Sequence, residues 1–325
     1  MMKHIVIITL YLILRIIPAD AAPIIVTDFR GKTLSFSKPP ERIVCLIESA
    51  LSGIYMLGAQ SRIVGISANV YNESVFSDYA DMDERIRQKK IPTPGNWDFV
   101  NIESVIALQP DLVLLWSHQE ESIRSLEEKG IPVFGVFIKN SDDVYREILA
   151  LGALTGKDAR ADELIRYTKQ ELRRFSEKTA KGNRPKIYFM WAQGELETSG
   201  KNSTVHELIE IAGGINVCGH IEQEHLVVNI ENVLTWNPDL VIMWHNTAKD
   251  PKDLLQNPMW QSVNAVKARR VYEFPNAFLC DLWTLKFQYA VKMIEKWAYP
   301  QSFEHVDLEK EKLDMLKFLY GKQPK

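Results

Sequence analysis

The sequence predicts an α/β protein of two similar lobes, each with a small, mostly parallel sheet, joined by one long α-helix. The first observation behind this is a duplication: VNIESVIALQPDLVLLW (residues 100–116) recurs as VNIENVLTWNPDLVIMW (residues 228–244), with ten of 17 positions identical. The second is that the apolar runs have strand length and lack polar alternation, which is typical of parallel strands covered on both faces. The third is a stretch of helical spacing between the copies, residues 141–181.

Length and composition agree with two soluble domains. A chain of 325 residues is long for a single core and predicts two domains of about 120–150 residues. It is 46% apolar and 25% charged, with a net charge of −3, so it has no basic excess and we expect no nucleic-acid partner. We expect a monomer. The predicted division is a signal peptide over 1–22, an N-terminal lobe over 23–140, a connecting helix over 141–181, a C-terminal lobe over 182–300 and a C-terminal tail over 301–325.

The first residues predict export. A short, weakly basic start precedes the apolar run 5–14, and Ala19-Asp20-Ala21 resembles a signal-peptidase site. Cleavage is expected near Ala21 or Ala22. The apolar run is too short to span about 30 Å of hydrocarbon, so a membrane anchor is not expected. No cysteine lies near this site, so the sequence predicts a periplasmic protein that is not a lipoprotein.

The three cysteines, Cys45, Cys218 and Cys280, are an odd number for an oxidising compartment. Cys218 and Cys280 both lie in the second half of the chain. Two alternatives therefore stay open: these two pair as a disulfide, or all three are small buried apolar residues.

Each half reads as a βαβα unit. In each copy of the duplicated segment an Asn caps a short helix, an acidic residue follows in its first turn, and a Pro ends it before the strand. These residues are Asn101, Glu103 and Pro110 in the first copy, and Asn229, Glu231 and Pro238 in the second. The further expected strands are 42–46, 62–67, 131–137, 186–191 and 270–274, and the further expected helices are 50–58, 119–129 and 205–214.

The connecting segment is expected to be a strut. Ser141 and Asp142 form a helix-start signal, and the apolar positions that follow have helical spacing. A continuous helix of about 40 residues would be about 60 Å long and would cross both lobes. Gly152 and Gly156 are the places where it can bend or break.

Ligands of open parallel sheets bind beyond the carboxyl ends of the strands, and this rule selects the candidate site. It places five tryptophans from both lobes at one cleft, which would offer a broad stacking surface for a bulky ligand. For any single tryptophan the ordinary alternative is core packing under a loop. The predicted ligand-binding residues are Glu48, Tyr71, Trp97, Trp116, His118, Trp191, Trp244, His245, Asp281 and Trp283.

His118 and His245 occupy nearly equivalent places in the two halves. Each is either a hydrogen-bonding loop residue or, facing its counterpart across the cleft, a group that binds a metal or an anionic ligand. A zinc or manganese carrier would need about three histidines and a carboxylate, of which these two and Asp281 could supply part. No zinc-protease, nucleotide-loop or nucleophile-elbow motif occurs, so we expect neither an enzyme nor a resident cofactor, and a secreted metal-dependent enzyme is the least favoured alternative.

Several segments together resemble the substrate-binding proteins of iron–siderophore and vitamin B12 importers. They are residues 42–67, the duplicated pair 100–116 and 228–244, residues 205–217 and residues 257–275. The resemblance implies two α/β lobes joined by one long helix. It also implies capture of a metal chelate (an iron–siderophore, haem or corrinoid) and delivery to an inner-membrane ABC transporter. Some members of this family bind molybdate or tungstate, and the duplicated segments also look like theirs, so an oxyanion is the alternative ligand.

The resemblance also implies one acidic residue near the start of a helix on the outer face of each lobe, which docks to arginines of the permease. Glu207 fits this role in the second lobe, unless it is an ordinary solvated helix residue. In the first lobe the matching position is Ser52, with Glu48 four residues earlier, so a symmetric dock is in doubt. Few residues expected at the cleft are basic, and Lys201 is the clearest. This favours a neutral or hydrophobic chelate, or a small oxyanion held by backbone amides and histidine.

Overall fold

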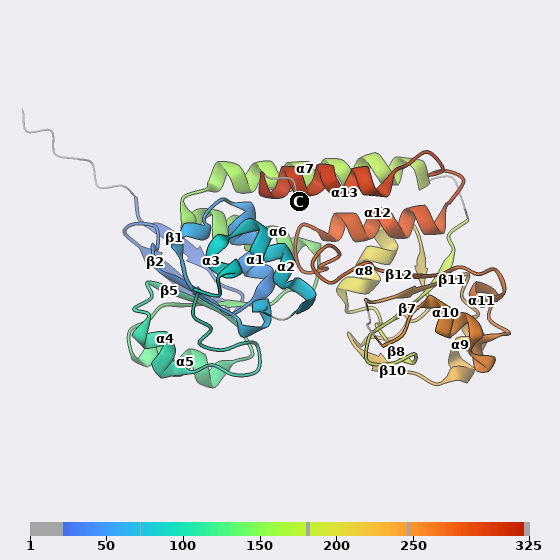
Figure 1. Ribbon diagram of the computed structural model, residues 1–325, viewed down its shortest axis with the longest axis horizontal. Coiled ribbons are helices and arrows are strands. Elements are labelled where there is room, and N and C mark those ends of the chain that lie inside the picture. Colours follow the sequence, from blue (N-terminus) through green and yellow to red (C-terminus); the bar gives the residue numbers. More distant parts are fainter. Residues whose placement is uncertain (1–21, 72, 180–182, 246–247, 322–325) are drawn as a thin grey trace, which may run out of the picture.

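Two α/β lobes lie side by side beneath a layer of long helices (Figure 1). The computed structural model describes residues 22–71, 73–179, 183–245 and 248–321. The predicted signal peptide, apart from Ala22, lies outside the described residues. In the described ranges every helix is too short or too polar to cross a bilayer. The predicted α/β class and the two-lobe arrangement are confirmed.

The N-terminal lobe contains a parallel sheet of four strands in the order β4-β3-β5-β6, preceded by an antiparallel β1-β2 hairpin. The strands are β1 (Ile24–Thr27), β2 (Thr33–Phe36), β3 (Ile43–Cys45), β4 (Ile63–Ile66), β5 (Leu112–Trp116) and β6 (Val133–Val136). The helices are α1 (Glu48–Met56), α2 (Glu73–Met82), α3 (Glu84–Arg87), α4 (Ile102–Ala107) and α5 (Glu120–Glu128), with short 3-10 turns η1 (Gln60–Arg62) and η2 (Ala68–Tyr71). The interior strands β3 and β5 are buried almost throughout, which explains their unbroken apolar sequences.

The C-terminal lobe repeats this plan with the strand order β12-β11-β7-β9, again parallel. Its strands are β7 (Lys186–Met190), β9 (Ile215–Asn216), β11 (Leu240–Met243) and β12 (Val271–Glu273), and β8 (Glu197–Thr198) pairs antiparallel with β10 (Leu226–Val227). Its helices are α8 (Thr204–Ile211), α9 (Ile230–Trp236), α10 (Pro251–Gln256), α11 (Asn264–Lys267), α12 (Phe287–Ala298) and α13 (Leu308–Tyr320), with the turn η3 (Pro258–Trp260).

The duplicated segment forms the same unit in both lobes, as predicted. The first copy is α4 followed by β5, and the second is α9 followed by β11. The Asn101 Oδ1 accepts a hydrogen bond from the Ser104 N–H at 2.9 Å, and the Asn229 Oδ1 accepts one from the Asn232 N–H at 2.8 Å. These side chains satisfy N–H groups that a helix N-terminus leaves unpaired, so the repeated Asn fixes where each helix begins.

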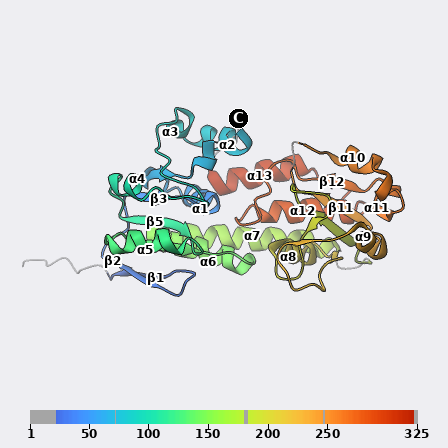
Figure 2. The ribbon, with the colours of Figure 1, turned by 90° about the horizontal axis from the view of Figure 1, so that it is seen from below.

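The connecting segment is two helices, so the expectation of one helix over 141–181 is wrong. Helix α6 (Ser141–Thr155) belongs to the N-terminal lobe, and α7 (Asp158–Thr179) alone passes from one lobe to the other (Figures 1 and 2). Gly156 ends α6 with φ 67°, in the left-handed region that glycine adopts without strain. Gly152 lets the chain fold back tightly, because a Cβ there would lie 2.7 Å from the Ala161 Cβ.

The region expected to be a C-terminal tail contains α13, which packs on both lobes. The Phe318 ring stacks on the Tyr167 ring of α7 with centroids 3.8 Å apart. The hydroxyl groups of Tyr320 and Ser52 lie 2.6 Å apart, so α13 also contacts α1 in the N-terminal lobe. Two helices, α7 and α13, therefore hold the lobes together.

The three cysteines are free and buried. Cys218 belongs to a core cluster of the C-terminal lobe, whereas Cys280 belongs to the large cluster that spans the lobe junction. The pairing of Cys218 with Cys280 is therefore wrong, and the alternative of buried apolar residues is confirmed.

Candidate ligand-binding cleft

A cleft of about 510 Å³ lies between the two lobes and takes its walls from both. In the N-terminal lobe its lining follows the strand ends: Glu48 comes after β3, Asn69 after β4, His118 after β5 and Phe137 after β6. In the C-terminal lobe Trp244 comes directly after β11, and residues 277–283 come after β12. The cleft is thus where parallel sheets are expected to place a ligand.

Seven of the ten sequence-predicted residues line this cleft, namely Glu48, Trp97, Trp116, His118, Trp244, Asp281 and Trp283. Contact between these side chains and a ligand stays a prediction. The lining also includes residues that the sequence did not single out, among them Tyr79, Asp98 and Glu224. Asp98 is the neighbour of a predicted tryptophan, whereas Glu224 lies in the loop between β9 and β10, two residues before β10 begins, where the sequence predicted no strand.

The tryptophans form a connected aromatic wall on the C-terminal lobe. The ring of Trp191 lies 5.4 Å from that of Trp244 and 6.5 Å from that of Trp283, and it is parallel to Trp283 within 6°. Trp191 does not line the cleft; its indole N–H donates to the Ser199 Oγ at 2.8 Å. It therefore packs against the two cleft tryptophans without lining the cleft itself. Such ring pairs contribute about 0.5–1.5 kcal/mol beyond their buried area, which stabilises the arrangement of the three rings.

The opposite wall belongs to the N-terminal lobe. The Trp116 ring stacks on the His118 ring with centroids 6.4 Å apart and planes within 16°. Trp97 is 54% exposed. A half-exposed apolar ring at the edge of a cleft is available to contact a ligand.

The other two sequence-predicted residues lie away from the cleft. The Tyr71 hydroxyl donates to the Ile91 backbone carbonyl at 2.9 Å, which ties down the loop after β4. The His245 Nδ1 lies 3.8 Å from a carboxylate oxygen of Glu273 on the neighbouring strand. His118 and His245 consequently do not face each other as an equivalent pair. The described residues bring together no group of three or more His, Cys, Asp or Glu side chains that could hold a metal ion.

Two carboxylates, Glu48 and Asp281, form the polar floor of the cleft, and a buried amine lies beneath this floor. The Ser67 hydroxyl donates to the Glu48 Oε1 at 2.6 Å, and the Trp283 N–H donates to the Asp281 Oδ1 at 3.0 Å. Beneath Asp281 lies the Lys286 amine, 4.0 Å from the Asp281 Oδ2 and 3.5 Å from the centroid of the Phe278 ring. Burial lowers the pKa of Lys286 to about 8, while the nearby Asp281 opposes this change. Burial likewise raises the pKa of Asp281, against the stabilising charge of Lys286.

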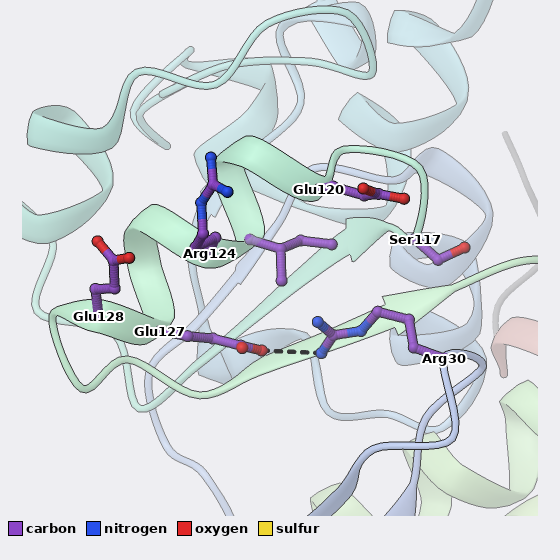
Figure 3. A pocket seen from close by; sticks show the side chains of 7 residues that line it. Arg30, Ser117, Glu120, Arg124, Glu127 and Glu128 are labelled. Carbon is purple, nitrogen blue, oxygen red and sulfur yellow. Dashed lines mark hydrogen bonds and ion pairs between the residues drawn. The ribbon is translucent and has the colours of Figure 1, made fainter.

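A second hollow lies on the surface of the N-terminal lobe, and Figure 3 shows the residues that line it. The Arg30 guanidinium in it donates to Asp28 at 2.7 Å, to Glu127 at 3.0 Å and to the Val133 carbonyl at 2.9 Å. These contacts fasten the β1-β2 hairpin to α5 and β6. Because the guanidinium is used inside the lobe and only one lobe contributes, this hollow is a structural joint and not the candidate site.

The two residues predicted to dock to a permease are both engaged within the chain. The Glu207 carboxylate on α8 accepts hydrogen bonds from the Ser141 N–H and hydroxyl, each at 2.7 Å, so it caps the start of α6 across the lobe junction. Glu48 lies in the cleft. Their docking role stays a prediction, and their placement gives it no support.

A fold of two α/β lobes with an aromatic cleft between them, joined by a helix, is that of a bilobal solute-binding protein. The family model for periplasmic binding proteins matches residues 43–277, so the chain belongs to this family. Over 298 residues it is 27% identical to the uncharacterized ABC transporter substrate-binding lipoprotein YvrC of Bacillus subtilis, which covers 88% of each chain. Over 312 residues it is 24% identical to the molybdate-binding protein MolA of Haemophilus influenzae, again covering 88% of each. A periplasmic solute-binding protein from Veillonella parvula is similar in structure, with a TM-score of 0.78 and 26% identity over 92% of this chain and 93% of that one.

Proposed function

We propose that this protein captures a bulky metal chelate, such as an iron–siderophore, haem or corrinoid, and delivers it to an ABC transporter of the inner membrane. The observation that carries this proposal is the size and lining of the cleft. About 510 Å³ between two lobes, with tryptophans on both walls, is within the range of pockets that enclose molecules of several hundred daltons. Rings such as Trp116, Trp244 and Trp283 stack on flat or apolar ligand surfaces, which chelates expose and hydrated ions do not.

The oxyanion alternative is less well supported, although MolA is named for molybdate binding. A small oxyanion is held by closely set N–H donors or by Arg and Lys side chains. Among the described residues that line the cleft none is Lys or Arg, and four are acidic. Lys201, the basic residue that the sequence pointed to, pairs with Glu222 at 3.1 Å on the exposed surface. A bare divalent ion also lacks a ligand group in the described part of the chain.

Native mass spectrometry of the protein isolated from its own periplasm tests this proposal. We expect the bound mass of an intact chelate, released unchanged when the protein is denatured. An oxyanion or a bare divalent ion as the bound species would overturn the chelate proposal. Release of a chemically converted ligand would instead support an enzyme.

We further propose that the permease contacts Glu103 and Glu231 rather than Glu207 and Glu48. The expected dock is an acidic residue near the start of an outer helix in each lobe. Glu103 and Glu231 are exposed and lie in the first turns of α4 and α9, at equivalent places of the duplicated segment. Both helices lie on the side of the molecule away from α7 and α13 (Figure 1).

The test reverses one charge at a time. Glu103→Lys and Glu231→Lys should each reduce uptake of the chelate by cells at least tenfold while leaving the affinity of the purified protein unchanged, because charge pairs at a rim act mainly on association with the partner. Glu128→Lys on α5, which is also exposed, is the matched control. Normal uptake by both variants would refute this dock.

Export is the last part of the proposal. The family is extracytoplasmic, and the predicted cleavage near Ala21 or Ala22 would release a soluble periplasmic protein. Sequencing the N-terminus of the mature protein should read from Ala22 or Pro23 without a lipid. A lipid-modified cysteine at the mature N-terminus would contradict the prediction that the protein is not a lipoprotein.

A further inference from the structure

The Asp and Glu side chains that line the described part of the cleft are not matched there by Lys or Arg. Both lobes contribute carboxylates to its lining: Glu48 and Asp98 from the N-terminal lobe, Glu224 and Asp281 from the C-terminal lobe. The described lining residues include no Lys or Arg. A ligand enclosed between the lobes therefore meets negative charge on both sides, and the interaction is strongest at the less exposed carboxylates Glu48 and Asp281, where water screens it least.

Most of these carboxylates lack a cation of their own. In the described part of the chain, Glu48, Asp98 and Glu224 have no Lys or Arg within ion-pair distance, although many other acidic residues of this protein do. Among the described residues, the side chain that donates a hydrogen bond to the Glu48 carboxylate is the neutral Ser67 hydroxyl. A carboxylate in a cleft that is not neutralised by the protein is available to neutralise a ligand.

Among the described residues, the Lys286 and Lys139 amines lie against lining residues of the cleft and have to be counted. The Lys286 amine is buried beneath Asp281 and offsets that carboxylate, so Asp281 contributes less than a full charge. The Lys139 amine lies 5.1 Å from the centroid of the Phe137 ring and is exposed to solvent, where water screens it. Glu48, Asp98 and Glu224 remain without a cation after this count, and of the three Glu48 is the one that is half-buried, whereas Asp98 and Glu224 are exposed and screened by water until a ligand covers them.

We infer, on the basis of the proposed function, that the chelate bound by this protein carries a net positive charge. The aromatic walls select for shape and size, and the carboxylates Glu48, Asp98 and Glu224 select against anionic chelates of the same shape. Binding of a cationic chelate relieves the repulsion among these groups, whereas an anionic one adds to it and loses its own hydration without compensation.

The test uses three ferric trihydroxamates that share one linear backbone and differ at its terminal amine: the free amine (+1), the N-acetyl derivative (0) and the N-succinyl derivative (−1). Their affinities for the mature protein are measured by quenching of tryptophan fluorescence at low and high salt. We expect the cation to bind at least tenfold more tightly than the anion at low salt, with the neutral complex between them and a smaller spread at high salt. An aquo-corrinoid (+1) and its cyano form (0) make a second pair of different shape.

Two variants and a control locate the effect. Glu48→Gln and Asp98→Asn should each weaken binding of the cation about threefold to tenfold and weaken binding of the neutral complex by a smaller factor, so that the ratio of the two affinities falls. Glu222→Gln removes an exposed carboxylate outside the cleft and should alter none of the affinities. Equal affinities in all three charge states, or tighter binding of the anion, would overturn the inference and leave the chelate function intact. Failure of both the hydroxamate and the corrinoid series to bind would overturn the proposed function, and the inference with it.

Discussion

The buried Lys286 makes the stability of this protein depend on pH in a way that can be calculated. Its side chain has no exposed surface, its amine has no hydrogen-bond acceptor among the described residues, and the nearest carboxylate oxygen, in Asp281, is 4.0 Å away. Burial lowers the pKa of Lys286 from 10.5 to about 8 because a charged amine is poorly solvated there. The test changes the pH and compares the free energy of unfolding of the wild type with that of Lys286→Met.

Whether the free energy of unfolding rises or falls with pH depends on how many protons the folded and the unfolded chain each bind. Below about pH 8 the folded and unfolded chains both hold the proton, so the full cost of burying the charge, about 3 kcal/mol at about 1.4 kcal/mol per pH unit, is present. Between about pH 8 and 10.5 the folded chain has released the proton and the unfolded chain has not. The free energy of unfolding therefore rises with pH in this window, by about 2 kcal/mol from pH 7.5 to 9.5.

Urea unfolding at pH 7.5 and 9.5 measures this contribution. In the unfolded chain tyrosines and cysteines titrate in the same range, while burial raises the pKa of Cys45, Cys280 and several tyrosines in the folded protein; these groups are common to both proteins, so the quantity of interest is the difference between wild type and Lys286→Met. Wild type should gain about 2 kcal/mol relative to the variant on going to pH 9.5. Lys139→Met, at an exposed amine, is the control and should gain nothing. The same stability difference at both pH values would refute the assignment of a buried, charged lysine.

Three further predictions concern the helix layer and the cleft. Lys292→Met removes the buried amine to which Glu171 and Glu311 both bind and leaves Arg174 as the cation that still pairs with both carboxylates, so it should cost about 1.5–3 kcal/mol in urea unfolding; no measurable loss would show that the Lys292 contacts are not structural. Trp283→Ala should weaken binding of the preferred chelate about tenfold and lower the stability by less than Trp260→Ala does, since Trp283 loses its contacts with Trp191 and Trp244, whereas Trp260→Ala, in the core, should lower the stability by about 3–5 kcal/mol and keep the affinity; the reverse result would make Trp283 a core residue. Small-angle scattering should show nearly the same radius of gyration with and without chelate, since α7 and α13 both tie the lobes together, and a large contraction would contradict this.

The strands and short helices of the duplicated segment could be predicted because local signals decide them. Apolar runs without alternation predicted β5 and β11, and the Asn caps predicted where α4 and α9 begin, with Asn101 and Asn229 in their expected roles. Each of these features depends on residues within about ten positions of one another. Nothing distant in the chain had to be known.

The connecting segment and the C-terminal region could not be settled locally. Gly156 was recognised as a possible break, but whether a helix bends or ends at a glycine depends on what packs there, and here Gly152 meets Ala161 in the returning helix. The last 25 residues were expected to be a tail, whereas α13 exists as a packed helix through contacts with partners far away in sequence, such as Tyr167 and Ser52. Tertiary packing of an amphipathic face supplies most of the stability of such a helix.

The sequence predicted where the cleft lies, but it predicted only some of the side chains that line it. The strand-end rule locates a loop at the edge of a sheet, yet it does not say which way a side chain in that loop points. Trp191 and Trp244 follow neighbouring strands. Of the two, Trp244 lines the cleft, while the Trp191 ring packs against the Trp244 ring. Lys286 was not predicted either, since a lysine just before a helix is ordinarily exposed, and its burial depends on the rings of Phe278 and Tyr320.

Some residues of the duplicated halves occupy equivalent places in the two lobes, and others do not. The equivalent residues lie on the outer surface, and the non-equivalent ones lie at or near the cleft. The equivalent residues Glu103 and Glu231 are exposed on both lobes, which suits a partner that presents two similar halves. His118 and His245 are nearly equivalent in sequence, but one lines the cleft and the other lies against Glu273. A ligand between the lobes is therefore met by different side chains on its two sides, and it needs no twofold symmetry to fit. The repeated scaffold thus presents similar outer surfaces on the two lobes, while the unrepeated residues make the two walls of the cleft different.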